Sequence, residues 1–439
     1  MKRVITNIAV LGLLVATPAV AQQQASLSLS QAECRKMALT YSEDLQRADN
    51  AVRQAELEKA AAFSNYLPKV DGSVMLEYMT DMDMAGVTLQ MRGMYLAGIT
   101  LTQPIFVGGK IRNGNKLAEI GKECSQEQRT MARMQVVADA DKAYWTYIAV
   151  LWKVKMLEVY KQQMDTLYGQ TRLSVNSGMA TNSSLLQINA KRNEIEYQLQ
   201  KAKNGANLCR LSLCNVIGCP LDSEITPTDT VITLTEPGDL ENSIESRPEL
   251  RLLQKQVEAA ELQVKTTRAD FLPQVALSAG YTYYGNVKIV GQTADAQGNP
   301  ISYSQEYSDG IGLAMLSVNI PIFHWGEGSK KVKKSKLEVQ NMQLEQQKNA
   351  RLMSIEVQQA IQNVMDSHAL ARTADLGRQQ AEESLREMQN RYACGMCSLI
   401  ELMDAQSQWQ QAESNNIEAQ TQCKISETEY LRVTGKMTD

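Results

Sequence analysis

The sequence contains the same series of motifs twice, and this internal repeat limits the folds that the chain can adopt. Two motifs recur in the same order, Leu67-Pro68-x-Val70 at 272–275 and Pro104-Ile105-Phe106-x-x-Gly109 at 321–326. The copies are 205 residues apart for the first motif and 217 for the second, so the second copy carries twelve additional residues. We expect these residues in the polar, glycine-rich stretch 285–310, which we interpret as a long loop. A duplicated chain predicts two similar halves rather than several unrelated domains.

The N-terminus has the features of a bacterial secretory signal peptide. Lys2 and Arg3 precede an apolar stretch at residues 8–15, and the small-residue triplet Ala19-Val20-Ala21 ends the leader at residues 1–21. We therefore expect an exported protein whose mature chain begins at Gln22. The remaining sequence divides into a first repeat at residues 22–218, an irregular connector with a short strand at 219–240 and a second repeat at 241–439.

Each repeat contains two stretches in which apolar and polar residues alternate, at residues 73–78 and 95–102 and again at 275–283 and 316–319. Strands of about ten residues with one apolar face are typical of the wall of an outer-membrane β-barrel. Four strands are too few to close a barrel, and an open sheet edge is unstable in lipid. We therefore predict that several chains share one barrel.

Long segments without proline follow the strands, at residues 108–176 and 326–393. At about 1.5 Å per residue they predict helices of roughly 100 Å. Residues at alternating spacings of three and four form a coiled-coil seam in the first segment: Val137, Ala140, Tyr144, Tyr147, Leu151 and Val154. We expect each long helix to reverse at a glycine turn into a helix of half its length that ends at Gly218 or Gly435. Half-length helices at 30–66 and 241–271 precede the strands and are expected to stack on the returning helices.

The composition excludes several classes of function. Only His324 and His368 are available for histidine chemistry, and His368 falls in the repeated seam, where we expect a packed interior side chain rather than a ligand. The 45 basic and 49 acidic residues give a formal charge of −4, which offers no case for nucleic-acid binding. We predict no enzymatic activity, no cofactor and no bound metal.

Aromatic and basic residues mark the places where strands give way to helices. We expect Phe106, Phe323 and Trp325 at the membrane interface. Basic residues follow at once: Lys110, Arg112, Lys116, Lys330, Lys331, Lys333 and Lys334. Two interpretations stay open for them, contact with the phospholipid headgroups of the outer membrane and a solvated helix face.

Eight cysteines are unexpected in an exported chain. Cys394 and Cys397 have the CxxC spacing that carries redox or zinc chemistry in some proteins. An isolated CxxC depends on its context, so an enzymatic or metal role is an alternative that rests on these two residues alone.

The signal peptide, repeated halves, strand pairs and very long helices together resemble the TolC family of outer-membrane efflux proteins. The most specific match is similar to the family's helical-tip motif: Tyr392-x-x-Gly395-x-x-Ser398-x-x-Glu401-Leu402-Met403-Asp404-Ala405-Gln406. The resemblance implies a mainly α fold with four strands per chain, assembled as a homotrimer with a twelve-stranded barrel and an α-helical periplasmic tunnel. It also implies a passive exit duct for efflux or type I secretion, without enzymatic activity, joined to a periplasmic adaptor and to an inner-membrane transporter of the RND, ABC or MFS type.

The resemblance assigns expected roles to residues of the tips. Glu401 and Asp404 match acidic rings of a periplasmic aperture, and Tyr392 matches a constriction tyrosine of some members. Cys397 and Ser184 stand where those members have an arginine and an aspartate, so an ionic latch of that kind is missing or rebuilt. The tips presented to the adaptor would carry Gly178, Met179, Gly395 and Met396.

Two alternatives stay open. A non-channel coiled-coil protein, such as a surface fibre, explains the heptads but not the repeated strand pairs. A solvated helix start explains the acidic residues of the tip without an aperture, because acids are favoured near a helix N-terminus. The sequence does not specify the cargo, which in this family includes drugs, metals, detergents and polypeptides.

Overall fold

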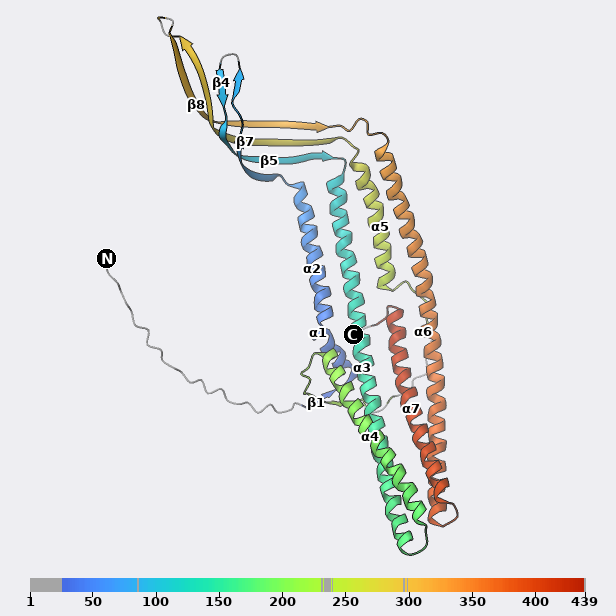
Figure 1. The fold of residues 1–439 in the computed structure, drawn as a ribbon. Helices are drawn as coiled ribbons and strands as arrows, with labels where there is room; N and C mark the ends of the chain where they lie inside the picture. Colours follow the sequence, from blue (N-terminus) through green and yellow to red (C-terminus); the bar gives the residue numbers. More distant parts are fainter. Residues whose placement is uncertain are drawn as a thin grey trace, which may run out of the picture.

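The computed structural model describes residues 26–84, 87–229, 240–294 and 299–437, together with residues 232, 238 and 297. The expected leader at 1–21 and the expected mature start at Gln22 lie outside the described residues, as does most of the connector from 230 to 239. The described part is a long bundle of helices with a β-sheet at one end (Figure 1). Within it, no helix combines the length and the apolar character needed to cross a membrane.

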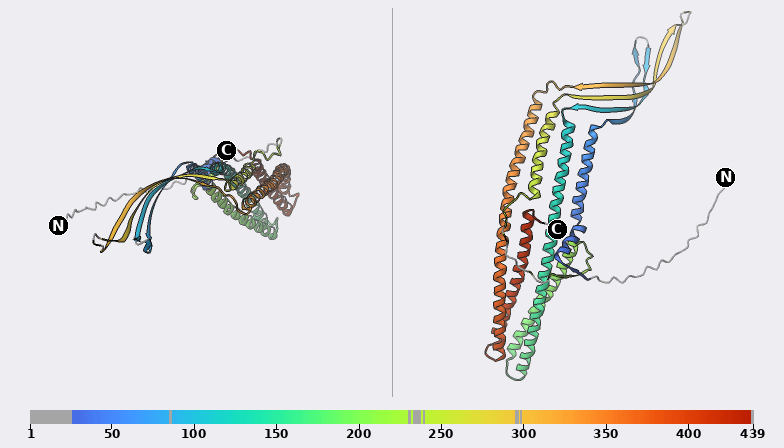
Figure 2. Two further views of the ribbon diagram at one scale, coloured as in Figure 1. Left: turned by 90° about the horizontal axis from the view of Figure 1, so that it is seen from above. Right: turned by 180° about the vertical axis from the view of Figure 1, so that it is seen from behind.

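Two helices of equal length run through the whole bundle. α3 spans Lys110–Asn176 and α6 spans Glu327–Ala393, and each has 67 residues. Both begin after a glycine with positive φ, 85° at Gly109 and 76° at Gly326, a conformation that glycine adopts without strain. Figure 2 shows that both helices extend from the sheet to the opposite tips.

The predicted coiled-coil seam of the long helices is confirmed. Val137 and Tyr144 in α3 and Val357 in α6 are at most 1% exposed. The returning helices cover these seams, α4 (Asn182–Ile217) against α3 and α7 (Leu399–Val433) against α6. Burial of the seam supplies the apolar contacts that hold each antiparallel pair together.

The half-length helices are α1 (Gln31–Tyr41), α2 (Glu43–Phe63) with the 3₁₀ turn η1 (Ser64–Tyr66), and α5 (Pro248–Ala269). Figure 1 shows α2 in line with α4 beside α3, and α5 in line with α7 beside α6. Each full-length helix therefore lies beside two shorter helices placed end to end.

Two predicted helix boundaries are wrong, because each segment contains an internal signal for the start of a helix. The segment 30–66 is interrupted at Ser42, which leaves the helical conformation and accepts a hydrogen bond from the Leu45 N–H at 3.3 Å. The segment 241–271 becomes helical only at Pro248, because proline is favoured at the first helical position. Ser42 and Arg247 are equivalent positions of the repeat, so α2 and α5 begin at the same point of the shared plan.

Four long antiparallel strands form the sheet in the order β2-β5-β7-β8. They are β2 (Lys69–Tyr78), β5 (Arg92–Val107), β7 (Gln274–Ala294) and β8 (Pro300–Asn319). Two short strands, β3 (Met82–Met84) and β4 (Val87–Gln90), extend the first hairpin, and β4 also pairs with β7. Among the described residues β2 and β8 each pair along one edge only, so the sheet has two open edges.

The predicted loop at 285–310 is wrong, because strands occupy most of it. β7 continues to Ala294, β8 begins at Pro300, and the two strands pair over this whole length. The glycines that suggested a loop instead make room for cross-strand rings: a side chain at Gly285, Gly291 or Gly310 would collide with Tyr95, Tyr303 or Tyr281, respectively. The twelve additional residues therefore lengthen a hairpin, which projects beyond the first one in Figure 1.

A small parallel sheet fastens the connector to the bundle. β6 (Glu224–Pro227) is the short strand expected there, and it pairs with β1 (Ser26–Leu29), a strand that the sequence pattern did not predict. The hydroxyl of Tyr147 on α3 donates to the Ile225 carbonyl at 3.1 Å. The described part of the connector is thereby held against the middle of the first long helix.

Candidate functional site at the helical tips

The two tips of the chain have the same backbone construction. Gly178 ends α3 with φ 77°, and Gly395 ends α6 with φ 70°. The N–H of the following methionine bonds back to a helical carbonyl at 2.8 Å in both cases, Met179 to Ser174 and Met396 to Arg391. This is the Schellman C-cap, in which a left-handed glycine lets the last carbonyls of a helix find donors.

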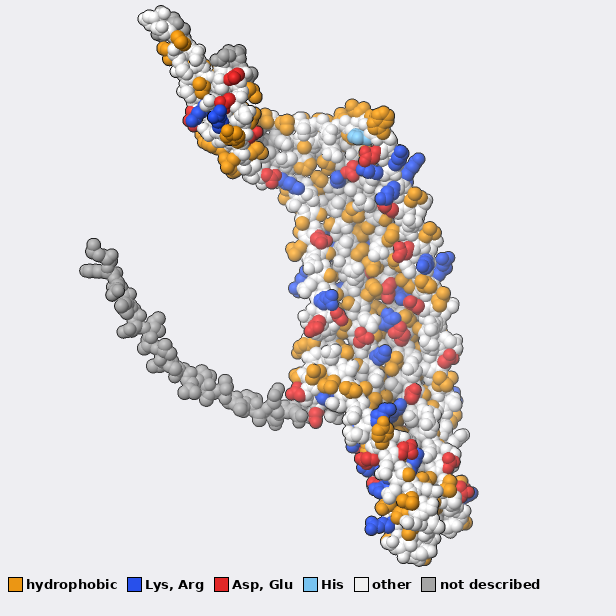
Figure 3. Space-filling view, viewed as in Figure 1, with side chains coloured by type: hydrophobic (Ala, Val, Ile, Leu, Met, Phe, Trp, Pro, Cys, Tyr) orange, Lys and Arg blue, Asp and Glu red, His pale blue; other side chains and the backbone are white. Residues whose placement is uncertain are grey.

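The methionines at the tips are turned outwards. Met179 is 84% exposed and Met396 is 70% exposed. Figure 3 shows hydrophobic side chains gathered on the face of the lower end of the bundle. The structure therefore brings all four predicted tip residues, Gly178, Met179, Gly395 and Met396, to the end of the molecule that lies farthest from the sheet (Figure 1).

Glu401 has a local structural role in addition to its charge. Its carboxylate accepts hydrogen bonds from the backbone N–H and the hydroxyl of Ser398, while the Glu401 N–H donates to that hydroxyl. This capping box starts α7. The hydrogen bonds from Ser398 lower the pKa of Glu401, so the exposed carboxylate is ionised at neutral pH.

Asp404 follows one helical turn later on α7, and its carboxylate is exposed. The Gln408 amide donates to it at 2.7 Å. Positions three apart lie on one face of a helix, so the two acids are stacked along α7. Tyr392 lies elsewhere: it is half-buried in an apolar cluster with Leu385 and Leu402.

The pocket beside Tyr392 contains polar residues that the sequence analysis did not single out. It measures about 560 Å³, and its lining includes Gln163, Gln389 and Gln406. Gln406 is 2% exposed, and its side-chain oxygen has no hydrogen-bond partner among the described residues. Gln406 follows the buried Leu402 by four residues, so the two lie on the same face of α7. This spacing is the sequence signal that predicts an interior position for Gln406.

The architecture and the tips now allow comparison with known proteins. A family model described as outer membrane efflux protein matches residues 34–218 and 240–436. The chain belongs to the outer membrane efflux protein family. The two matched segments cover most of the chain, one on each side of the connector.

Individual relatives are distant but similar over most of their length. The probable outer membrane lipoprotein SilC of Salmonella typhimurium is 21% identical over 382 residues, which cover 84% of this chain and 77% of that protein. The outer membrane efflux protein BepC of Brucella suis is 22% identical, over 88% of this chain and 81% of that protein. A solved structure of CusC, from a study of its folding and transmembrane channel formation, superposes with a TM-score of 0.76 at 14% identity and covers 93% of both chains.

The predicted fold class and localisation are confirmed for this outer membrane efflux protein. The fold is mainly helical with four long strands, as in the outer-membrane channel to which it is similar. Family membership places the protein in the outer membrane, with the helical bundle in the periplasm. Family and fold are those of transport channels rather than enzymes.

The predicted interface aromatics of the efflux protein lie where the sheet meets the helices. Phe106 is in β5, near its end, while Phe323 and Trp325 precede α6. The rings of Phe323 and Trp325 meet edge to face with centroids 5.0 Å apart. All three side chains are exposed, Trp325 to 84%. Phe323 and Trp325 thus form an exposed apolar pair just before the start of α6, and Phe106 lies just before the start of α3.

Three of the basic residues at the starts of the long helices have acidic partners. Lys110 pairs with Asp270 at 2.7 Å across two helices, and Lys331 pairs with Glu327 at 2.6 Å. Lys334 lies 3.7 Å from Glu338. These pairs fit the interpretation as a solvated helix face for part of the cluster, and contact with lipid headgroups stays a prediction.

The two cysteines of the CxxC segment differ in their surroundings. All eight cysteines of the chain are free thiols. Cys394 is exposed, while the Cys397 thiol donates to the Met388 carbonyl at 3.5 Å. Loss of solvent contact raises the pKa of Cys397, which disfavours the reactive thiolate.

Proposed function

We propose that the protein is a passive homotrimeric exit duct of a tripartite efflux or type I secretion system. The observation that carries this proposal is the pair of open edges at β2 and β8. Backbone groups at an open edge cannot stay unpaired in a bilayer. Three copies of a four-stranded sheet supply twelve strands, which is enough to close a barrel.

The side chains of the sheet support a lipid-facing wall. Val74 and Leu76 on β2 and Leu316 on β8 lie on one face of the sheet and are 78%, 80% and 60% exposed in the single chain. Large apolar side chains at such exposure are favoured by contact with lipid rather than water. Phe106, Phe323 and Trp325 would then lie at the level of the headgroups.

Glu401 and Asp404 are proposed to line the periplasmic aperture. In a trimer, three copies of each would form two acidic rings, one turn apart along α7. Such rings raise the local concentration of cations and oppose the entry of anions. Tyr392 would support the aperture from the apolar cluster behind it rather than from the rings themselves.

The exposed tips are proposed to bind a periplasmic adaptor. Met179 and Met396 offer flexible apolar side chains that adapt to a partner's surface. Gly178 and Gly395 keep the turns narrow, so a helical hairpin could approach the backbone closely. Through the adaptor the duct would join an inner-membrane transporter of the RND, ABC or MFS type.

The duct is proposed to have no enzymatic activity. The rival idea rests on Cys394 and Cys397 alone. Replacing both with serine should leave trimer assembly and conductance unchanged. The one hydrogen bond described for these thiols is the weak S–H contact from Cys397 to the Met388 carbonyl. Loss of a measurable catalytic activity in that variant would support the rival.

The non-channel coiled-coil alternative is not favoured, since it gives no role to a sheet that belongs to the channel fold. The deciding experiment is purification from outer-membrane fractions followed by planar-bilayer recording. Heat-resistant trimers with conductance are expected. A soluble rod without conductance would overturn the proposal. A photoreactive group at Met396, which is exposed at the tip, would then capture the adaptor and identify its transporter.

A further inference from the structure

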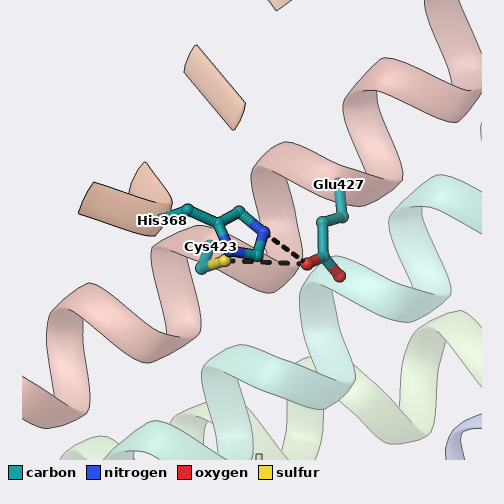
Figure 4. A group of neighbouring side chains, drawn as sticks. All are labelled: His368, Cys423 and Glu427. Atoms are coloured by element: carbon teal, nitrogen blue, oxygen red, sulfur yellow. Dashed lines mark hydrogen bonds and ion pairs between the residues drawn. The ribbon is translucent and has the colours of Figure 1, made fainter. Parts of the chain in front are cut away.

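Three potential metal ligands meet between α6 and the C-terminal part of α7. His368 is on α6, while Cys423 and Glu427 are one turn apart on α7 (Figure 4). The His368 Nε2 lies 2.9 Å from the Glu427 Oε1, and the Cys423 Sγ lies 3.7 Å from the same oxygen. All three ligand atoms lie within 4.8 Å of one another.

Burial and a neighbouring lysine hold the ligand atoms of His368, Cys423 and Glu427 towards one another. Cys423 is completely buried, and the side chains of His368 and Glu427 are 12% and 31% exposed. The two carboxylate oxygens have different partners, because Lys424 binds Oε2 at 2.9 Å and leaves Oε1 to face His368 and Cys423. Lys424 therefore fixes the orientation of the Glu427 carboxylate, and the partly exposed His368 and Glu427 leave the cluster accessible to small solutes.

The internal repeat offers a control within the molecule. The positions 217 residues earlier are Leu151, Ala206 and Arg210, none of which provides a thiol, an imidazole or a carboxylate. Arg210 bonds instead to the carbonyls of Leu221 and Ser223. The packing of a returning helix on a long helix does not require His, Cys and Glu at these places, so the cluster is particular to the second half.

We propose that His368, Cys423 and Glu427 form a binding site for one divalent transition-metal ion per chain, of the class represented by Zn²⁺. Imidazole nitrogen, thiolate sulfur and carboxylate oxygen are the ligands that Zn²⁺ uses, and three protein ligands leave a fourth position for water. Tetrahedral bonds of about 2.0–2.3 Å put ligand atoms roughly 3.4 Å apart, so the present spacings need only small shifts. Binding would replace the His368–Glu427 hydrogen bond and release the Cys423 proton to solvent.

An ion at this point would link α6 to α7. Because the folded arrangement brings the ligands together and the unfolded chain does not, binding would stabilise the contact between the two helices. This inference does not depend on the aperture or on the adaptor. It differs from the sequence-based interpretation, which placed His368 in the seam as a packed side chain without a ligand role.

Cobalt(II) is the probe, because a cobalt–thiolate bond gives a charge-transfer band that carboxylate sites lack. The full-length trimer would be freed of metal with a chelator and titrated with Co²⁺. A Cys394→Ser/Cys397→Ser background removes the tip thiols. We expect the band to saturate at one Co²⁺ per chain in this background and to disappear when Zn²⁺ is added.

Two variants and one control test the ligands. Cys423→Ala should abolish the band, and His368→Gln should weaken Co²⁺ binding at least tenfold while heat-resistant trimers persist. Cys34→Ala replaces another completely buried cysteine, on α1, and should leave the band unchanged. A band that is absent from the background protein, or that survives Cys423→Ala, would overturn the proposal. If Cys423→Ala does not assemble, an unchanged Co²⁺ affinity in His368→Gln would overturn it by itself.

Discussion

The Arg35 guanidinium forms two parallel hydrogen bonds with the Asp141 carboxylate, at 2.8 and 2.6 Å. Asp141 is only 1% exposed, and Thr428 also donates to it at 3.1 Å. The carboxylate therefore joins α1 and α3, which belong to the first half of the repeat, to α7, which belongs to the second half.

Asp141→Asn should destabilise the protein by about 3 kcal/mol, because it leaves Arg35 without its counter-charge in a largely buried place. The measurement is the thermal midpoint of the purified trimer. Arg47→Ala is the matched control, since its pair with Asp44 is almost fully exposed and is worth less than about 1 kcal/mol. Equal midpoints for the two variants would contradict the prediction.

Ser398→Ala should loosen the start of α7 by about 1 kcal/mol through loss of the N-cap. The effect should depend on pH. The native pKa of Glu401 lies below its ordinary value, so the stabilisation is present above that ordinary value and is lost as the pH falls through the native pKa. Hydrogen exchange of residues 399–402, corrected for intrinsic rates, would measure this.

Thr181→Ala is the control for that experiment. Thr181 caps α4 in the same way, accepting from the Ser184 N–H at 3.3 Å, but no carboxylate takes part. The loss of helix stability in Thr181→Ala should be similar to that in Ser398→Ala, and it should not depend on pH in the acidic range. A pH dependence shared by both tips would show that the capping box is not its source.

Asp404→Ala should reduce the preference of the channel for cations, because it removes one of the two proposed rings without touching a helix cap. Glu401→Ala should reduce selectivity and also destabilise the start of α7. Reversal potentials in asymmetric salt measure the first effect, and Asp404→Glu, which keeps the charge, should behave as the unaltered protein does. Unchanged selectivity in Asp404→Ala would remove this residue from the aperture.

Asn286→Ala should lower the thermal stability of the trimer more than Asn286→Gly does. Asn286 sits at the register shift of β7 with φ 63°, and its amide donates to the carbonyls of Arg92 and Gly93 at 3.0 and 2.9 Å. Both variants lose these bonds, but glycine keeps the left-handed conformation without strain and alanine does not. Equal midpoints would show that the backbone conformation at this position carries no cost.

The sequence predicts the elements whose signal is local. The seam at Val137 and Tyr144 is visible because a helix repeats its buried face every few residues, and the strands are visible because their faces alternate. The turns at Gly178 and Gly395 are visible because only a few residues accept a positive φ.

The remaining features depend on residues that are far apart in the sequence. Nothing near Gly310 indicates that the ring of Tyr281 will lie over it, so a glycine-rich strand looks like a loop. The pairing of β1 with β6 joins segments about 200 residues apart. The cluster of His368 with Cys423 is likewise a product of how α7 packs on α6, and the heptad pattern identifies the packing without identifying the chemistry.

The equal lengths of α3 and α6 also limit how the two halves can change over evolutionary time. One residue inserted in the middle of either helix would turn everything beyond it by about 100° and move the buried face out of alignment with its neighbour. Lengthening the hairpin of β7 and β8 carries no such penalty, because it rotates no helix, and the twelve extra residues of the second half are found there. The two copies therefore differ in length in a hairpin, where growth turns no helix, while α3 and α6 have kept the same 67 residues.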